Sequence, residues 1–151
     1  MISNDTLIFR SLIQKDIEEI LEMLNNLSRK NKEFFHPHKF NIETLIDNLN
    51  SNDHYFVLIL ENKIIGYSFL RLFGYKIPSF GCCIRKGYEN KGYGALLTRW
   101  TINKAKDFGY SKVILKTYKE NTSAQKIYKK IGFKIIGETE DKEQYQMILK
   151  L

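Results

Sequence analysis

Residues 85–94 read Arg-Lys-Gly-Tyr-Glu-Asn-Lys-Gly-Tyr-Gly. An apolar segment, 77–84, comes before them, and an amphipathic segment runs from Ala95 toward Phe108. This order predicts a strand, a tight turn and a helix. The glycines at 92 and 94 let the backbone approach a ligand closely. Because a helix start presents free N–H groups and the positive end of its dipole, the stretch predicts a phosphate-binding loop.

Two common nucleotide-binding motifs do not fit this loop. No Gly-Lys-Ser/Thr follows, so it is not a Walker loop, and the third glycine of a dinucleotide fingerprint is missing. An ordinary turn between a strand and a helix is the simplest alternative, because turns use glycine freely. The neighbouring cations Arg85, Lys86 and Lys91 favour an anion site over that alternative.

A second motif lies at residues 121–133, Asn-Thr-Ser-Ala-Gln-Lys-Ile-Tyr-Lys-Lys-Ile-Gly-Phe. On a helix, Asn121, Ala124 and Tyr128 share one face, and the small alanine leaves a groove between an amide and a phenol. A phenol is a suitable acid for protonating a departing thiolate. Two simpler roles stay open: Tyr128 as a half-buried core aromatic and Asn121 as a helix N-cap.

The bulk properties indicate one folded domain, 1–151, with a formal charge of +7. Such a charge favours anionic partners or reflects a lysine-rich surface. Cys82 and Cys83 are adjacent, so a disulfide between them would be strained, and the pair alone builds no metal site. Free thiols suit a reducing compartment. With no signal peptide or membrane-spanning run, we expect a cytoplasmic protein.

The pattern along the chain predicts a mixed sheet with helices on both faces, an α/β (α+β) fold. Asp16 is the expected N-cap of a first helix, with Glu19 completing a variant capping box, and Asn41 is the expected cap of a second. Residues 28–40 suggest a loop or a short irregular helix. The expected strands are 6–10, 55–60, 64–72, 79–84, 112–116, 133–137 and 144–149, and the later helices are 95–108 and 121–131.

Together, the phosphate loop and the 121–133 motif resemble the GCN5-related N-acetyltransferase (GNAT) family. The stretch 78–133 resembles its acetyl-CoA-binding core, and the remaining segments match its element order. The resemblance implies a single domain with a mostly antiparallel sheet of about seven strands. It also implies that the fourth and fifth strands splay apart, and that acetyl-CoA is the co-substrate, with no metal.

The resemblance also assigns site residues. Tyr128 matches the tyrosine that serves as general acid near the thioester sulfur, and a backbone N–H near Ile84 would stabilise the oxyanion. Glu89 departs from the usual Arg or Gln, so we expect it to point outward while Arg85, Lys86 or Lys91 attracts the pyrophosphate. The implied cofactor-binding residues are Ile84, Lys86, Lys91, Gly92, Tyr93, Gly94, Ala95, Asn121 and Tyr128.

The acceptor is less defined. Its implied class is a primary amine of a small molecule, such as an amino sugar or its nucleotide. Protein N-terminal acetylation of the ribosomal-protein type is the alternative, followed by non-catalytic binding of CoA or of nucleic acid. The aromatic residues do not interleave with basic ones on an evident strand platform, which argues against nucleic-acid binding. Dimers are common in the family, but no sequence feature requires one. Candidate bases are Glu33, His36 and His38, and candidate pocket residues are Phe34, Phe35, Arg71 and Tyr75.

Overall fold

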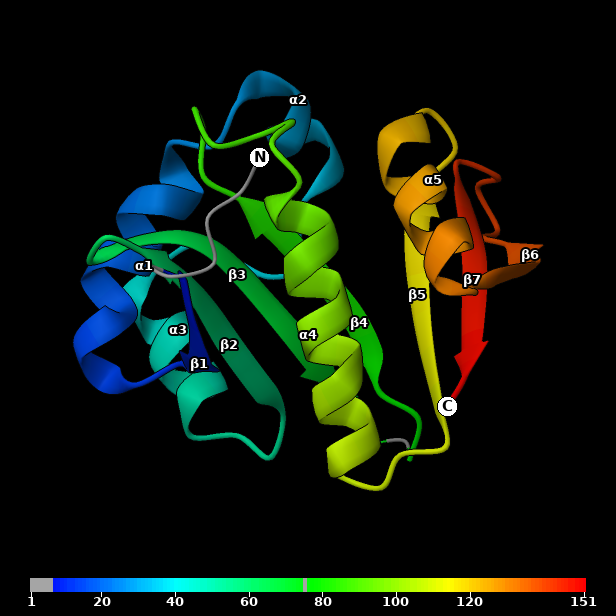
Figure 1. Ribbon diagram of the computed structural model, residues 1–151, viewed down its shortest axis with the longest axis horizontal. Coiled ribbons are helices and arrows are strands. Elements are labelled where there is room, and N and C mark those ends of the chain that lie inside the picture. The colour runs from blue at the N-terminus through cyan, green and yellow to red at the C-terminus, as the bar shows by residue number, and fades with distance from the viewer. Residues whose placement is uncertain (1–6, 75) are drawn as a thin grey trace.

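The computed structural model describes residues 7–74 and 76–151, which form a seven-stranded sheet with helices on both faces (Figure 1). Residue 6, the expected start of the first strand, lies outside the described residues. No described helix is both long enough and apolar enough to cross a bilayer. The strands are β1 (Leu7–Ser11), β2 (His54–Leu60), β3 (Lys63–Arg71), β4 (Ser79–Ile84), β5 (Lys112–Tyr118), β6 (Lys134–Glu138) and β7 (Gln144–Lys150). The helices are α1 (Ile17–Asn25), α2 (Arg29–Phe34), α3 (Ile42–Leu49), α4 (Tyr93–Asp107) and α5 (Thr122–Ile131), with a 3-10 turn η1 (Gln14–Asp16) before α1.

The sheet confirms the expected topology. Its strand order is β1-β2-β3-β4-β5-β7-β6, and every neighbouring pair is antiparallel except β4 and β5. These two parallel strands share one register pair, Ser79 with Ile114. Beyond that pair the two strands separate toward their carboxyl ends, as their ribbons show in Figure 1. The splay predicted for the fourth and fifth strands is therefore present.

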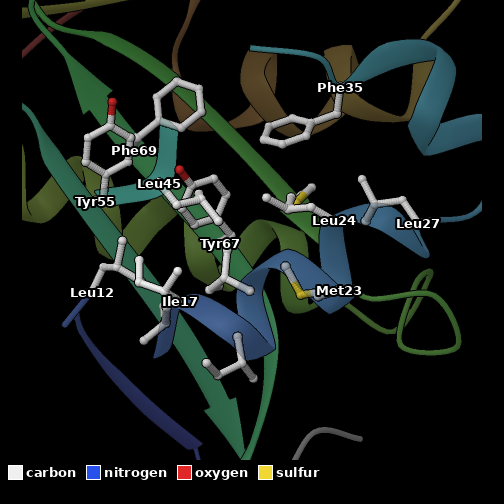
Figure 2. Packing of buried hydrophobic residues seen from close by; sticks show 14 of the residues in the cluster. Leu12, Ile17, Met23, Leu24, Leu27, Phe35, Leu45, Tyr55, Tyr67 and Phe69 are labelled. Atoms are coloured by element: carbon white, nitrogen blue, oxygen red, sulfur yellow. The ribbon is translucent and has the colours of Figure 1, made fainter. Parts of the chain in front are cut away.

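Each face of the sheet carries its own core. Successive residues of a strand point to opposite faces, so Val57 packs with α1 and α3, whereas Phe56 packs toward α4. Figure 2 shows the first core, where Leu24 of α1, Leu45 of α3 and Tyr67 of β3 lie together. Because both faces are covered, the central strands are apolar almost throughout.

The start of α1 differs from the expected capping box. The Asp16 side chain makes no cap hydrogen bond to α1. Instead it accepts two hydrogen bonds from the Arg10 guanidinium, at 2.7 and 2.9 Å, and one from the Ile13 N–H. Glu19 accepts from the backbone N–H of Ile64 in β3 rather than from its own helix. The partners of Asp16 lie three and six residues before it, whereas the partner of Glu19 is distant on the chain and local spacing gives no signal of it.

The short helix expected within 28–40 is present, and one helix boundary shifts. The segment 28–40 contains the short helix α2, whose N-cap Ser28 accepts from the N–H of Asn31. Helix α4 begins at Tyr93 rather than Ala95, directly after Gly92. The phosphate loop and the helix start therefore overlap, and Gly94 belongs to the first turn of α4. Helix α5 ends at Ile131. The next residue, Gly132, has a φ of 121°, which is in the range that favours glycine.

Candidate active site

The glycines of the phosphate loop have different structural roles. Gly92 is the N-cap of α4 and has a φ of 89°, which a residue with a side chain adopts only with strain. It supplies no side-chain cap, so the first N–H groups of α4 stay available to a ligand. A Cβ built on Gly94 would meet only Ile84 Cγ1, at 3.9 Å, and both residues line a cavity. Protein packing therefore leaves the space beside Gly94 open.

This cavity, which we call the α4–α5 cavity, has a volume of about 220 Å³. The predicted residues Ile84, Gly92, Gly94, Ala95, Asn121 and Tyr128 line it. Lys86, Lys91 and Tyr93 do not: both lysines are exposed, and Tyr93 packs against an apolar cluster. Sequence reasoning missed Asn31, Cys82 and Thr98. Thr98 follows Gly94 by one helical turn, a spacing that could have revealed it.

Asn121 and Tyr128 both face the α4–α5 cavity from α5. Asn121 is also the N-cap, since its Oδ1 accepts from the N–H of Ala124 at 3.4 Å, so one residue both caps α5 and lines the cavity. Tyr128 packs edge-on against Phe80 and Phe133, with ring centroids 6.1 and 5.8 Å apart. Burial, and then the nearby Cys82 thiol, raise the pKa of Tyr128 well above its ordinary value. The phenol is therefore protonated at neutral pH.

Glu89 does not point outward as expected. Its Oε2 accepts hydrogen bonds from Ser28 Oγ, at 2.9 Å, and from Asn31 Nδ2, at 3.1 Å. The same Asn31 amide lies 3.4 Å from the carbonyl oxygen of Ile84. The carboxylate is thus satisfied by uncharged donors from the first turn of α2. We call this set of contacts the α2 clamp.

Arg85 is also placed differently from the expectation that it attracts pyrophosphate. Its side chain is buried on the α1 side of the sheet, where Nη1 pairs with Glu22 Oε2 at 2.6 Å. Its Nε donates to the carbonyl oxygen of Ile64 at 2.7 Å. The alternation of side chains at the end of β4 explains this position, since Ile84 faces the other side. Lys86 and Lys91 remain near the loop to attract an anion.

A second, larger cavity of about 520 Å³ is lined by β3, β4, β5 and the chain at the end of α2. We call it the aromatic cavity, because aromatic rings form much of its wall: Phe34, Phe35, Phe69, Phe73, Phe80 and Tyr118. The candidate pocket residues Phe34, Phe35 and Arg71 line it, and Tyr75 lies outside the described residues. Strand β4 lines both cavities, with residues 79–81 at the aromatic cavity and 82–84 at the α4–α5 cavity. The two cavities therefore approach one another at β4, where β5 diverges.

The three candidate bases occupy different environments. His36 lines the aromatic cavity, and its Nε2 lies 3.0 Å from Tyr118 Oη and 3.1 Å from the carbonyl oxygen of Glu33. His38 is outside both cavities, and its two ring nitrogens contact Tyr67 Oη and the Lys39 carbonyl. Burial lowers the pKa of His38, so it is a neutral histidine with no nitrogen left for a substrate. The exposed Glu33 carboxylate belongs to a neighbouring cavity.

The cysteines have the environments expected of small apolar side chains. Cys82 faces α4, with its Sγ 3.8 Å from Thr98 Oγ1, and Cys83 packs in the core of the other face. Burial raises the pKa of Cys82 to about 11 and that of Cys83 well above its usual value. Both thiols are therefore neutral at physiological pH and poor nucleophiles. Among the described residues, no group of three His, Cys, Asp or Glu side chains could hold a metal ion.

Solved structures share this architecture. An acetyltransferase of the GNAT family from Streptococcus pneumoniae matches with a TM-score of 0.78 and 24% identity, over 96% of this chain and 99% of that one. The spermidine N-acetyltransferase from Vibrio cholerae, solved with CoA and spermine, matches with a TM-score of 0.81 and 20% identity, over 97% and 96%. The ribosomal-protein-S5-alanine acetyltransferase from Vibrio fischeri matches with a TM-score of 0.82 and 17% identity, over 99% and 95%.

The sequence also matches a family model directly. The model of the acetyltransferase (GNAT) family covers residues 21–133, which include α2, the phosphate loop and the whole of α5. The matched range therefore contains every element that lines the α4–α5 cavity. The phosphate loop at the start of α4, the splayed β4 and β5 and the Asn121–Tyr128 face of α5 agree with that match. This chain belongs to the acetyltransferase (GNAT) family.

Proposed function

We propose that this protein transfers the acetyl group of acetyl-CoA to a primary amine of a small molecule held in the aromatic cavity. The observation that carries the proposal is the pair of cavities that meet along β4, one lined by residues 79–81 and the other by residues 82–84. A thioester delivered from one side and an amine delivered from the other would meet where β4 and β5 separate. The volume of about 520 Å³ on the acceptor side suits a small molecule.

Acetyl-CoA is the co-substrate of the family, and the α4–α5 cavity fits a phosphate-bearing ligand of this kind. The uncapped start of α4 would hold the pyrophosphate through the N–H groups of residues 92–95. The open space beside Gly94 lets the ligand approach this backbone. Asn121 and Tyr128 would contact the arm that leads toward β4. The exposed Lys86 and Lys91 add attraction at longer range.

Strand β4 can also supply the oxyanion donor. The Arg85 N–H donates to the carbonyl oxygen of Ile65 at 2.7 Å, and Cys83 is paired with Tyr67 of β3. Backbone groups alternate in direction along an antiparallel strand. The N–H groups of Cys82 and Ile84 therefore point away from β3, toward the space that β5 has left. Either N–H would stabilise the negative charge that develops on the thioester carbonyl oxygen.

In the proposed reaction, the amine nitrogen forms a bond to the acetyl carbon and the carbon–sulfur bond breaks. Tyr128 gives its phenolic proton to the leaving sulfur. The amine must lose a proton, and His36 is the candidate base that lines the aromatic cavity. If Nε2 of His36 donates to the Glu33 carbonyl, Nδ1 holds the lone pair that would accept this proton. Glu33 itself would act only through water.

The acid role of Tyr128 predicts a specific kinetic change. Tyr128→Phe keeps the ring packing against Phe80 and removes the proton donor, so kcat should fall by roughly 10²-fold while KM for acetyl-CoA changes much less. Steady-state assays of released CoA thiol measure both quantities. Tyr145→Phe is the matched control, because Tyr145 lines neither the α4–α5 cavity nor the aromatic cavity. An unchanged kcat in Tyr128→Phe would remove this residue from the acid role.

The transferase activity is tested with a panel of amines. It includes amino sugars, their nucleotide-linked forms, spermidine and a peptide that begins with alanine, with free CoA thiol as the readout. The last two probes represent the acceptors named for the Vibrio structures above. We expect acetylation of a small amine. Preferential acetylation of the peptide would favour the protein N-terminal alternative, and an intact thioester with every amine would favour a non-catalytic CoA binder.

A further inference from the structure

The charged side chains among the described residues that line the aromatic cavity are all positive. Arg71 and Lys116 are its charged lining residues, and the described part of its wall holds no Asp or Glu. His36 adds an ionisable group on the same wall. The acids Glu33, Glu120 and Glu143 line the neighbouring cavity together with Lys119 and Lys142. Phe34 and Tyr118 line both cavities, with their rings tilted by 32° and the ring centroids 5.6 Å apart, and they separate these acids from Arg71.

Arg71 is held in place without a charge partner. Its Nη1 donates to the carbonyl oxygen of Pro37 at 2.8 Å, and its guanidinium carbon lies 4.5 Å from the ring centre of Phe73 and 5.7 Å from that of Phe69. Within residues 7–74 and 76–151, no carboxylate lies within salt-bridge distance of this guanidinium, and its buried Nε has no hydrogen-bond partner. A half-buried cation that is fixed and unpaired is costly unless a ligand balances it.

We propose that the acceptor amine also carries an anionic group, a carboxylate or a phosphate, which pairs with Arg71, and an apolar or ring-shaped body that packs against the aromatic wall. The proposal rests on the acetyl transfer proposed above and narrows its substrate class. A guanidinium forms strong paired hydrogen bonds with both kinds of anion. A polyamine has only positive charges, so Arg71 and Lys116 would repel it.

The same cations would assist the chemistry. An ammonium group cannot attack a thioester, so the acceptor must react as a neutral amine. A nearby positive charge disfavours the ammonium form and lowers the pKa of the bound amine. An acceptor anchored by its anion to Arg71 would therefore lose its proton more readily than the same amine in water. This lowers the demand on His36 as a base.

The first test measures binding without chemistry, by calorimetry in the presence of CoA. Two pairs of ligands differ in the anion: 3-phenylpropionate with 3-phenyl-1-propanol, and phenyl phosphate with phenol. We expect the anionic member of at least one pair to bind about tenfold tighter or better, as a charge-assisted contact to Arg71 predicts. The pair with the larger ratio identifies carboxylate or phosphate as the preferred anion. Equal affinities within both pairs overturn the proposal.

Variants assign the effect to Arg71. In Arg71→Gln the ratio of the affinity for the anionic ligand to that for its uncharged partner should fall to about one. Arg71→Lys should retain part of this ratio because the positive charge remains. Arg99→Gln is the matched control: it removes an exposed arginine of α4 that lines neither cavity, and the ratio should stay unchanged. Thermal unfolding shows whether each variant is folded. If the ratio in both Arg71 variants is the same as in the native protein, the proposal is overturned.

The second test uses acetyl transfer and separates the two proposals. L-Phenylalanine is compared with 2-phenylethylamine, and glucosamine 6-phosphate with glucosamine, by kcat/KM from released CoA. The anionic amine should be favoured by about tenfold or more in at least one pair. Equal rates within both pairs overturn the anionic acceptor but leave the transferase intact. If no amine releases CoA while the anionic ligands still bind tighter, the transferase proposal fails and Arg71 remains an anion site.

Discussion

Gly81 occupies a position in β4 where any other residue would displace the wall of the aromatic cavity. A Cβ built on Gly81 would overlap the ring of Phe69, with the ring carbon Cε1 at 2.8 Å. Gly81 pairs with Phe69 across β3 and β4, and both residues line the aromatic cavity. Glycine is thus needed here for the close approach of an aromatic ring to the backbone, rather than for its conformational freedom.

This close approach predicts the effect of one methyl group. Gly81→Ala should lower the free energy of unfolding by about 1–3 kcal/mol, because the Phe69 ring must leave its position. It should also raise KM for the acceptor. Urea denaturation of Gly81→Ala, Phe69→Leu and the double variant measures the coupling. The double variant should lose clearly less free energy of unfolding than the two single variants lose together. Strictly additive losses would contradict the steric explanation.

At the scale of elements, α2 connects the two cavities. Its first turn holds Glu89 of the phosphate loop through Ser28 and Asn31, and its last residue, Phe34, lines the aromatic cavity. The following residue, Phe35, is buried and packs edge-on against Tyr67, which fixes the chain that leads to His36 (Figure 2). The α2 clamp thus explains why a glutamate is present at position 89, although its negative charge alone would disfavour pyrophosphate binding.

Two substitutions at Glu89 separate the clamp from simple repulsion. Glu89→Gln and Glu89→Ala both remove the negative charge, but only glutamine keeps an oxygen that accepts from α2. We expect KM for the acceptor to be about fivefold higher in Glu89→Ala than in Glu89→Gln, as the loss of about 1 kcal/mol of hydrogen bonding predicts. Steady-state kinetics with both substrates measures this. Equal KM values in the two variants would exclude the clamp.

At the scale of the whole molecule, stability depends on ion pairs that join one element to another. The Arg10–Asp16 pair links β1, at the edge of the sheet, to the turn that begins α1. Burial alone would raise the pKa of Asp16, but the hydrogen bonds from Arg10 and the Ile13 N–H, with the charge of Arg10, lower it below its usual value. A carboxylate with a lowered pKa in the folded state contributes stability above the unfolded-state pKa of about 4.

This linkage predicts the pH at which the pair stops contributing. At pH 7, Asp16→Asn should lower the free energy of unfolding by about 1–3 kcal/mol, because the half-buried Arg10 loses its charged partner. As the pH falls below about 4, Asp16 of the native protein takes up a proton, and the difference should shrink. Urea denaturation across this pH range provides the measurement. Asp47→Asn removes an exposed carboxylate of α3 and should have little effect on the free energy of unfolding at any pH. If the difference between Asp16→Asn and the native protein stays the same at every pH, the role assigned to Asp16 is contradicted.

The sequence by itself determined those features that depend on residues near one another in the chain. Apolar spacing predicted the principal strands and helices, and Gly92, Gly94, Asn121 and Tyr128 were found because each lies at a helix start or on one helix face. The family resemblance supplied the splay of β4 and β5. These predictions succeed because turn geometry, helix periodicity and capping are local.

The tertiary structure alone decided which partners these charged side chains meet. Asp16 binds Arg10, Arg85 binds Glu22 and Glu89 binds α2. Local spacing had suggested a helix cap for Asp16, and the family resemblance had suggested a pyrophosphate partner for Arg85 and an outward carboxylate for Glu89. Only folding brings Arg71, the aromatic rings and β4 around one cavity, and a charge takes its role from the partners that folding brings within a few ångströms.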